Sequence, residues 1–231
     1  MKRRQKRNDV NSARTGRSHN GKTKLNSLQV ASIVLGSIVL ICAASFGGYV
    51  IHENVMHQKA LENYPVAYTD FITQYATEYE QDPYLVQSIM RCESSNDPDA
   101  VSNVGAIGLM QIMPDTGTWI AHKLDLDDVY TEDMLYDPQT NIEFGCWYLH
   151  FLSGRFHDNR KQMIAAYNAG HGTVEKWLED PEYSQDGELV TIPYEQTARY
   201  YDNVTAAYEN YTTLYPDLFL PNDPATSIVE G

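Results

Sequence analysis

Charged residues are absent from one long stretch of this 231-residue chain: between Leu25 and His52 there is no Asp, Glu, Lys or Arg. The central part of the stretch, 30–51, has 22 residues, and a helix needs about 20 mainly apolar residues to cross a bilayer. Its serines and glycines dilute the apolar run, but membrane helices tolerate them. We therefore expect a transmembrane signal anchor over residues 28–51, which contacts membrane lipid.

Acidic residues are scarce before this stretch, and basic residues are scarce after it. Residues 1–27 hold nine Lys or Arg and one acid, whereas the remainder of the chain holds eight bases and thirty acids. Because the positive-inside rule keeps a basic flank in the cytoplasm, residues 1–27 are predicted to be a basic cytoplasmic tail. The chain is thus expected to be a single-pass protein of the cell membrane, with its acidic part on the extracytoplasmic side. Such an acidic part disfavours nucleic acid as a partner.

The apolar stretch is open to other interpretations than a signal anchor. Small residues such as Ala43, Ala44 and Gly47 offer a cut site for a cleaved signal peptide. A lipoprotein signal that ends at Cys42 fits less well, because Ile41 precedes the cysteine. A buried core helix conflicts with the basic tail beside it. That tail has the composition of a nucleic-acid-binding arm, but beside a membrane helix it more simply sets topology and touches anionic lipid.

Cysteine is also rare, with three residues in the whole chain. Cys42 belongs to the apolar stretch, which leaves Cys92 and Cys146 in the acidic part. An oxidising compartment permits a disulfide between them, and burial as two small hydrophobic residues is the alternative that the sequence leaves open. The histidines show no HExxH or similar spacing, so neither a metal nor a cofactor is expected.

No segment alternates polar and apolar residues over more than a few positions, so an extensive sheet is not expected. Apolar residues recur instead at helical steps. Asp82 and Asp137 each precede a proline, which combines an N-cap with proline at the first helical position, and Gly170 ends another helical pattern. The sequence therefore predicts an all-α, or nearly all-α, domain.

This helical domain is expected to cover residues 64–215. Its first helix is predicted to begin near Tyr64, where aromatic residues start to recur at three- and four-residue steps. Residues 52–63 are predicted to be a connector between the apolar stretch and the domain. Residues 216–231, which follow the last helical pattern, are predicted to be a loose C-terminal tail.

Glu93 is the candidate catalytic group. It lies three, four and seven residues after Met90, Ile89 and Val86, which places its carboxylate on the apolar stripe of a helix. Burial and the negative end of the helix dipole should both raise its pKa. A structural Glu paired with a base is the alternative, but Arg91 points to another helix face. An unpaired carboxyl group with a raised pKa suits general acid catalysis near neutral pH.

Three sequence blocks surround and follow this glutamate. They are Glu93-Ser94-Ser95, the segment GAIGLMQIMP at 105–114 and the segment AYNAG at 166–170. Together they resemble the soluble lytic transglycosylase (SLT) family of lysozyme-like enzymes, over roughly residues 68–212. The resemblance implies a lysozyme-like transglycosylase domain that acts on peptidoglycan glycan strands. It also leaves room for a partner in a cell-wall or secretion machinery.

The resemblance implies three catalytic residues. Glu93 matches the single acid/base of the family. Tyr167 matches a tyrosine whose hydroxyl lies near the acid, and Ser102 matches a serine near the acid and the acetamido group of the sugar. For Ser102 a local turn bond is the structural alternative, and by periodicity alone Tyr167 would belong to the core.

Further residues match substrate-binding positions. Gln111 matches an amide that binds sugar, and Met113 matches a cleft residue. Gly108 matches a position where the chain passes close to the sugar, for which an ordinary turn is the alternative. Asn168 resembles a supporting partner of Tyr167, with a purely structural bond as the alternative.

One segment departs from the family pattern. The family usually has Pro-aromatic-x-Glu-Thr-Arg before its last helix, whereas this chain has Gln196 at the Glu position and Ala198 at the Arg position. Gln keeps the capacity for hydrogen bonds but loses the charge. Gln196 is therefore counted among the candidate substrate-binding residues, and contacts to the peptide stem or to the outer subsites are in question.

The predicted reaction follows from the resemblance. Glu93 protonates the glycosidic oxygen between N-acetylmuramic acid and N-acetylglucosamine, and it then removes the proton from the C6 hydroxyl, which closes on C1 to leave a 1,6-anhydro product. A lysozyme-like muramidase of the same fold, which would use water, is the nearest alternative. A non-catalytic wall-binding scaffold module is the second.

Overall fold

The computed structural model describes residues 26–220, which divide into two units after Asn54. Nearly all of the predicted basic tail, 1–25, therefore lies outside the described residues. The same holds for 221–231 of the predicted C-terminal tail, of which 216–220 are described as turns without a further helix.

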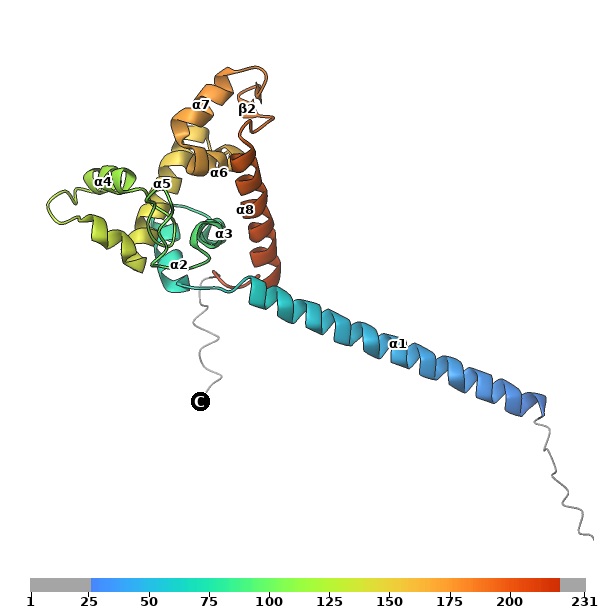
Figure 1. Ribbon diagram of the computed structural model, residues 1–231. Helices are drawn as coiled ribbons and strands as arrows, with labels where there is room; N and C mark the ends of the chain where they lie inside the picture. Colours follow the sequence, from blue (N-terminus) through green and yellow to red (C-terminus); the bar gives the residue numbers. More distant parts are fainter. Residues whose placement is uncertain (1–25, 221–231) are drawn as a thin grey trace, which may run out of the picture. The chain divides into compact units, whose positions relative to one another are not determined.

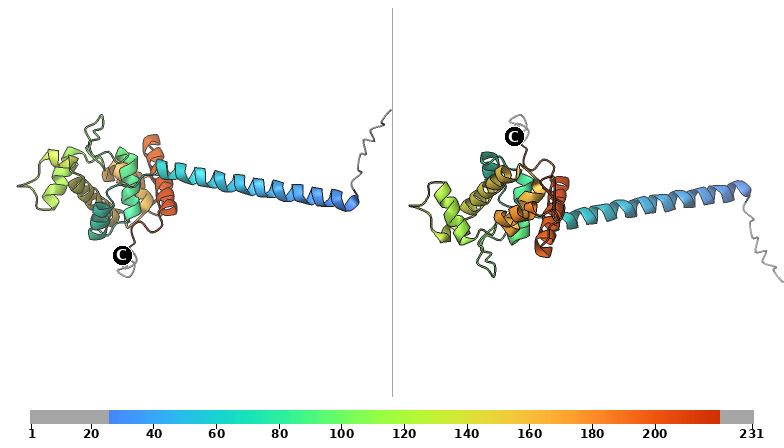
Figure 2. Two further views of the ribbon diagram at one scale, coloured as in Figure 1. Left: turned by 90° about the horizontal axis from the view of Figure 1, so that it is seen from below. Right: turned by 90° about the horizontal axis from the view of Figure 1, so that it is seen from above.

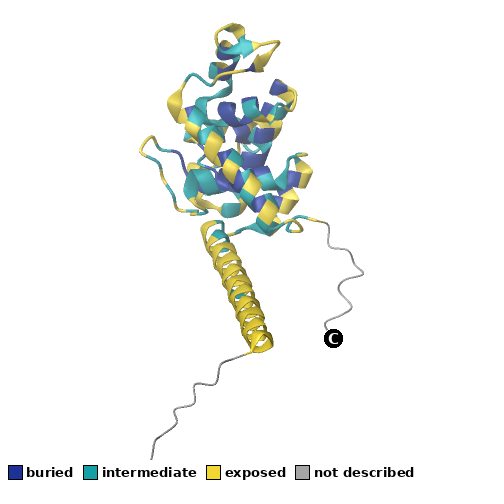
Figure 3. Ribbon diagram, turned by 90° about the vertical axis from the view of Figure 1, so that its right-hand side faces the viewer, coloured by how far each residue is buried: buried dark blue, intermediate teal, exposed yellow. Residues whose placement is uncertain are grey.

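The first unit contains most of α1, Ser27–Asn63, which is a single helix of 37 residues. Its side chains are exposed along nearly the whole length (Figure 3). Within residues 26–220 it is the one helix long and apolar enough to cross a membrane, a test that a signal sequence near the N-terminus also passes. The predicted connector, 52–63, continues α1 because it lacks Gly and Pro and is rich in good helix formers.

The second unit, from Val55 onward, is built almost entirely from helices, and the prediction of a nearly all-α fold is confirmed. Its elements, labelled in Figure 1, are α2 (Thr69–Glu78), α3 (Pro83–Ser94), α4 (Pro114–Lys123), the 3-10 helix η1 (Glu132–Tyr136), α5 (Pro138–Phe156), α6 (Arg160–Ala169), α7 (His171–Glu179), β1 (Ser184–Gln185), β2 (Glu188–Leu189) and α8 (Glu195–Leu214). The two strands form a small antiparallel hairpin in which Ser184 pairs with Leu189.

Both predicted aspartate caps are present. An Asp82 carboxylate oxygen accepts a hydrogen bond from the Tyr84 N–H at 3.0 Å, and Asp137 accepts one from the Thr140 N–H at 2.9 Å. These bonds satisfy donors that have no partner inside the first turn of a helix. Gly170 separates α6 from α7 with a φ of 82°, a backbone conformation that glycine adopts without strain.

The predicted start of the first helix was wrong by about one turn. The helix begins at Thr69 rather than near Tyr64. Pro65 lacks the N–H that a helix interior requires, and Tyr68 has a left-handed φ of 56°. The aromatic residues before Thr69 therefore pack from an extended segment, as Tyr64 does against the ring of Tyr211 with centroids 5.6 Å apart.

Helix α3 is the central element of the second unit. Its residues Leu85 to Met90 are all buried. It packs against α8 and α2, and Figures 1 and 2 show α8 beside it. A second core cluster, around Leu152, Phe156 and Trp177, joins α5, α6 and α7. Helix α3 thus packs against the helix that precedes it, α2, and against the last helix of the chain, α8.

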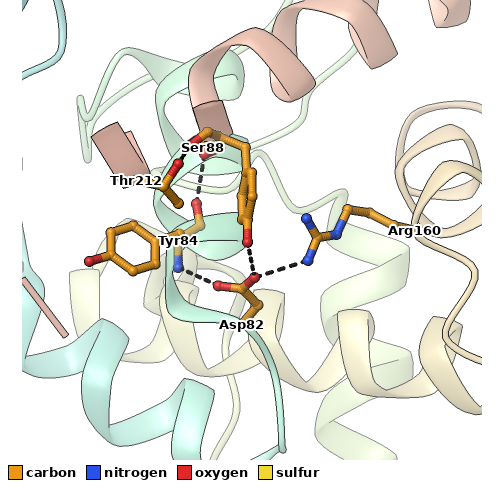
Figure 4. Close-up of polar contacts among 6 residues, drawn as sticks. Asp82, Tyr84, Ser88, Arg160 and Thr212 are labelled. Carbon is orange, nitrogen blue, oxygen red and sulfur yellow. Dashed lines mark hydrogen bonds and ion pairs between the residues drawn. The ribbon is translucent and has the colours of Figure 1, made fainter. Parts of the chain in front are cut away.

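Asp82 fixes the beginning of α3 to two other helices (Figure 4). Besides capping Tyr84, its carboxylate accepts hydrogen bonds from the Arg160 guanidinium at 3.1 Å and the Tyr208 hydroxyl at 2.7 Å. Arg160 lies on α6 and Tyr208 on α8, and the guanidinium carbon stands 4.2 Å from the centre of the Tyr208 ring. One side chain therefore combines an N-cap with two links between helices.

We predict that Asp82→Ala lowers the free energy of unfolding by about 2–3 kcal/mol. The expected loss combines an N-cap with charge-assisted hydrogen bonds to Arg160 and Tyr208. Urea denaturation measures it, with Glu195→Ala as the control, because the Glu195–Arg199 pair on α8 is highly exposed and such pairs are worth about 0.3–0.5 kcal/mol. Equal effects of the two substitutions would contradict this role of Asp82.

Candidate active site

Glu93 lies one residue before the end of α3 and is only partly exposed. Its carboxylate oxygen Oε1 accepts a hydrogen bond from the Tyr200 hydroxyl at 2.6 Å. Among the described residues it forms no ion pair. Arg91 is turned away, as the helical geometry predicted, because its guanidinium donates to the Asn63 carbonyl at 2.5 Å and lies over the Tyr64 ring. Within residues 26–220, Glu93 is therefore not part of a structural ion pair.

The environment of Glu93 favours its protonated form. Burial raises the pKa of this carboxyl group from 4.5 to about 7, and the hydrogen bond from Tyr200 opposes the rise in part. The cause is desolvation, since removal from water penalises the ionised form while a neutral hydroxyl returns only part of that loss. At neutral pH the group is therefore divided between acid and carboxylate.

The loop between α3 and α4, residues 95–113, is held by hydrogen bonds from Asn141, a buried residue of α5. Its Oδ1 accepts from the Met110 N–H at 2.7 Å, and its Nδ2 donates to the carbonyls of Ile107 at 2.9 Å and Leu135 at 2.7 Å. Ser94, next to Glu93, adds a bond from its hydroxyl to the Leu109 carbonyl at 2.8 Å. The loop is thus attached both to α5 and to the end of α3.

Two glycines allow this close packing. Gly108 is buried with a φ of 78°, and a Cβ there would lie 2.4 Å from both the Asn141 amide and the Leu135 carbonyl. The close approach that requires glycine is therefore to the protein itself. Gly145 on α5 makes room in the same way for the Met110 side chain. Gly108 thus faces Asn141 and Leu135 within the protein, and a contact between Gly108 and a ligand stays a prediction.

A hollow of about 230 Å³ opens in front of the loop, and it is called here the inner hollow. It brings together four of the predicted site residues, Gln111, Met113, Tyr167 and Asn168. Gln111 donates its side-chain amide to the carbonyls of Ala100 and Gly108. Met113 is 40% exposed just before α4. The remaining lining residues are Ile112, Thr116, Tyr148, Ala169 and Gly170.

Tyr167 and Asn168 end α6 at this hollow. The Tyr167 hydroxyl donates to the Met110 carbonyl at 2.9 Å, and the charge of Glu93 contributes, after burial, to raising the pKa of this phenol. Asn168 accepts a hydrogen bond from the Thr197 hydroxyl at 2.9 Å, which joins α6 to α8. Tyr167 therefore lies near Glu93 but is bonded to the loop.

Two other predicted residues lie elsewhere. The Ser102 hydroxyl accepts from the Ala106 N–H at 2.9 Å, which is the local turn bond that was its structural alternative. Gln196 is exposed on the first turn of α8. A role for either residue in binding or catalysis stays a prediction.

Cys92 and Cys146 are free thiols. Within residues 26–220, no three His, Cys, Asp or Glu side chains gather in a way that could hold a metal.

Tyr200 is the site residue that the sequence did not single out. It comes from α8, 107 positions after Glu93, and it lines a second hollow of about 390 Å³ between α3 and α8 with Arg91, Cys92 and Asn203 among its neighbours. Burial is the largest cause of its strongly raised pKa, followed by the charge of Glu93. Glu93 therefore bonds to a tyrosine of this second hollow and lies near a tyrosine of the inner hollow.

Glu93 itself is not among the residues that line either hollow, but it bonds to Tyr200 of the second one and lies near Tyr167 of the inner one. Residues 70–189 match the model of the transglycosylase SLT domain. The chain belongs to this family. The matched range contains Glu93 and the inner hollow, while Tyr200 lies beyond it.

Proteins with similar sequences include other members of the SLT family. The soluble lytic murein transglycosylase of Escherichia coli K12 is 38% identical over 154 residues, which are 65% of this chain and 24% of the relative. The membrane-bound lytic murein transglycosylase C of Actinobacillus pleuropneumoniae is 31% identical over 165 residues, 62% of this chain and 45% of the relative. The chain thus spans about a quarter to a half of the length of these curated relatives.

Solved structures of SLT enzymes share the fold. The 70-kDa soluble lytic transglycosylase of Escherichia coli matches with a TM-score of 0.61 at 35% identity, over 67% of this chain and 25% of that one. An inactive glutamate-to-glutamine mutant of lytic transglycosylase Slt from Pseudomonas aeruginosa matches with a TM-score of 0.59 at 34% identity, over 65% and 24%. The helical arrangement around α3 is therefore that of an SLT domain.

We predict that Tyr200→Phe raises the pKa of Glu93 above about 7, because the hydrogen bond from the hydroxyl favours the carboxylate. The carboxyl carbon of Glu93, followed by NMR during a pH titration, measures the change. Tyr167→Phe is the control, since the Tyr167 hydroxyl bonds to the Met110 carbonyl and not to Glu93. A shift of equal size in the control, or no shift in Tyr200→Phe, would contradict the assignment.

We also predict that Asn141→Leu destabilises the SLT domain by about 3 kcal/mol or more. Leucine is close to asparagine in size, so the main effect is to leave the Met110 N–H and the carbonyls of Ile107 and Leu135 buried without their bonds. Thermal unfolding measures the loss, and Asn203→Leu, at an exposed amide of α8, serves as the control. A loss as small as that of the control would show that Asn141 does not hold the loop.

Proposed function

We propose that this SLT protein is a lytic transglycosylase that cuts the bond between N-acetylmuramic acid and N-acetylglucosamine in peptidoglycan, with Glu93 as its acid/base. The observation that carries the proposal is the unpaired Glu93 carboxyl group, whose pKa of about 7 results from burial. Such a group can donate a proton and accept one back at neutral pH, which is the condition for efficient general acid–base catalysis.

The reaction requires two proton transfers at one carboxyl group. Glu93 gives its proton to the glycosidic oxygen as the bond to C1 breaks. The carboxylate that remains takes the proton of the C6 hydroxyl, and that oxygen forms the new bond to C1. The product is a 1,6-anhydro sugar, the acid is regenerated and no water is consumed.

The surroundings of Glu93 favour this route over hydrolysis by two carboxylates. Hydrolases of that kind hold their carboxyl groups about 5–9.5 Å apart, where the charge of the second would raise the pKa of the first. Within the described residues, the pKa of Glu93 responds to burial and to Tyr200, with no contribution from another carboxylate. A single acid suits a reaction whose nucleophile belongs to the substrate.

The relatives support the same activity. Proteins similar to this chain are named lytic murein transglycosylases, both soluble and membrane-bound. A similar solved enzyme was made inactive by exchanging a glutamate for glutamine, which is the behaviour that a single acid/base predicts. Gln111, Met113 and Asn168 line the inner hollow, and their amides and thioether are suited to contact the sugar. Ser102 is proposed to lie near the acid and the acetamido group of the sugar, and Gln196 is proposed to contact the substrate.

We further propose that α1 is a membrane anchor, which places the catalytic domain in the cell envelope on the extracytoplasmic side. The exposed apolar surface of α1, the basic residues before it and the membrane-bound relatives support this location. A cell-wall or secretion machinery is the kind of assembly in which such an anchored enzyme would act.

We predict that Glu93→Gln lowers the rate of glycan cleavage by about 10²–10⁴-fold, because glutamine can neither give nor take a proton. The matched control is Glu143→Gln on α5, a partly buried glutamate whose pKa is also raised by burial but which bonds to Tyr79. Release of soluble fragments from purified peptidoglycan measures both. A Glu93→Gln variant as active as the control would refute the assignment.

The pH dependence of the free energy of unfolding shows whether Glu93→Gln is folded. Because the pKa of Glu93 in the folded state lies above 4.5, the wild type loses stability as the pH rises from about 4.5 through 7. Glu93→Gln lacks this loss, so it should be at least as stable as the wild type at pH 8.

Mass spectrometry of the products of the wild-type enzyme distinguishes a lytic transglycosylase from a muramidase. A muramidase adds one water and leaves a reducing end, whereas the 1,6-anhydro product has neither.

A further inference from the structure

A hollow of about 330 Å³ lies next to the inner hollow, and it is called here the outer hollow. It is lined by Asp115, Thr116, Trp119, Tyr148 and His171. Thr116 and Tyr148 belong to both hollows, so the two form one continuous surface. A linear ligand in the inner hollow therefore has a direct path into the outer one.

Trp119 on α4 is held in a fixed orientation at this surface. It packs edge-on against Trp147 and Phe151 of α5, with ring centroids 5.1 and 5.0 Å apart and interplanar angles of 78° and 81°. Tyr148 approaches in the same way at 6.3 Å. Three rings nearly perpendicular to the indole plane restrict its rotation, and Trp119 nevertheless keeps part of its surface exposed. The indole is thus a rigid, partly open aromatic face.

Polar groups accompany this aromatic face. Asp115 is exposed in the first turn of α4, and His171 begins α7 with its ring 5.2 Å from that of Phe151. A pyranose ring presents C–H groups on its faces and hydroxyl or acetamido groups around its edge. An aromatic platform with a carboxylate and an imidazole nearby offers apolar contact to the face and hydrogen bonds to the edge. A sugar residue fits this combination of groups.

We propose that the outer hollow is a distal subsite for an N-acetylated sugar of the glycan strand, with Trp119 as its platform and Asp115 and His171 as its polar contacts. The identity of the sugar rests on the proposed function, while the site itself rests on the geometry of the hollow. Trp119 then determines specificity for strand length, because a long strand reaches the platform and a short one ends in the inner hollow.

The test uses the full-length protein in detergent micelles and uncross-linked glycan strands of graded length. Trp119→Ala should lower kcat/KM for long strands by about tenfold, which is the effect expected from the loss of one aromatic contact. For the shortest strands that are cut, kcat/KM should stay unchanged. Trp147→Phe is the control, since Trp147 packs behind Trp119 and does not line the hollow. An equal loss on short and long strands would show a structural role and overturn the proposal.

A binding measurement separates this proposal from the proposed function. In the Glu93→Gln protein, a chito-oligosaccharide should shift the indole N–H resonance of Trp119 in NMR spectra, and Asp115→Ala should weaken its binding severalfold. Asp115 is exposed, so this second variant remains informative if Trp119→Ala does not fold. Binding at Trp119 without any cleavage by the wild type would reject the enzyme and keep the subsite. Normal cleavage without binding at Trp119 would reject the subsite alone.

Discussion

The burial of a carboxyl group without a cation is the constraint on which this domain depends. Glu93 loses part of its hydration at the end of α3, and a neutral hydroxyl, that of Tyr200, is its hydrogen-bond partner at 2.6 Å. A guanidinium in the same place would keep the carboxylate ionised and its pKa low. The neutral donor restores only part of the lost hydration, so the pKa stays near 7. The fold must therefore hold in place a group that would be more stable in water.

Contacts among α3, α6 and α8 keep Glu93 in this position. At its beginning α3 bonds through Asp82 to Arg160 of α6 and to Tyr208 of α8. At its other end α3 bonds through Glu93 to Tyr200 of the same α8, and α6 brings Tyr167 to the neighbouring hollow. Along α8 these contacts therefore come in the reverse of their order along α3, and along α6 they come in the same order. Because both helices are fixed at the far end of α3, the tyrosines around the acid have defined positions, which is the preorganisation that a catalytic site requires.

Local patterns predicted the parts of this site that depend on neighbouring residues in the chain. The Asp-Pro pairs predicted the starts of α3 and α5, and the spacing of Val86, Ile89 and Glu93 predicted a half-buried carboxylate. Tyr200 was missed because its hydrogen-bond partner, Glu93, lies 107 residues away in the chain. The role of Asn141 was missed for the same reason, since its three bonds reach Ile107, Met110 and Leu135, which lie outside its helix. Pairings across long separations depend on tertiary packing, which periodicity does not contain.

The same acid serves an anhydro-forming lyase and a muramidase equally well, so Glu93 by itself does not choose between them. The choice depends on which oxygen is activated to attack C1. Water attacks when a second carboxylate removes its proton, and that carboxylate must be within several ångströms of the first. Glu143, a partly buried acid whose pKa is also raised, belongs to α5 and bonds to Tyr79, and it does not contribute to the pKa of Glu93. Within the described residues no second carboxylate contributes to the pKa of Glu93, and this supports the proposed attack by the C6 hydroxyl of the substrate.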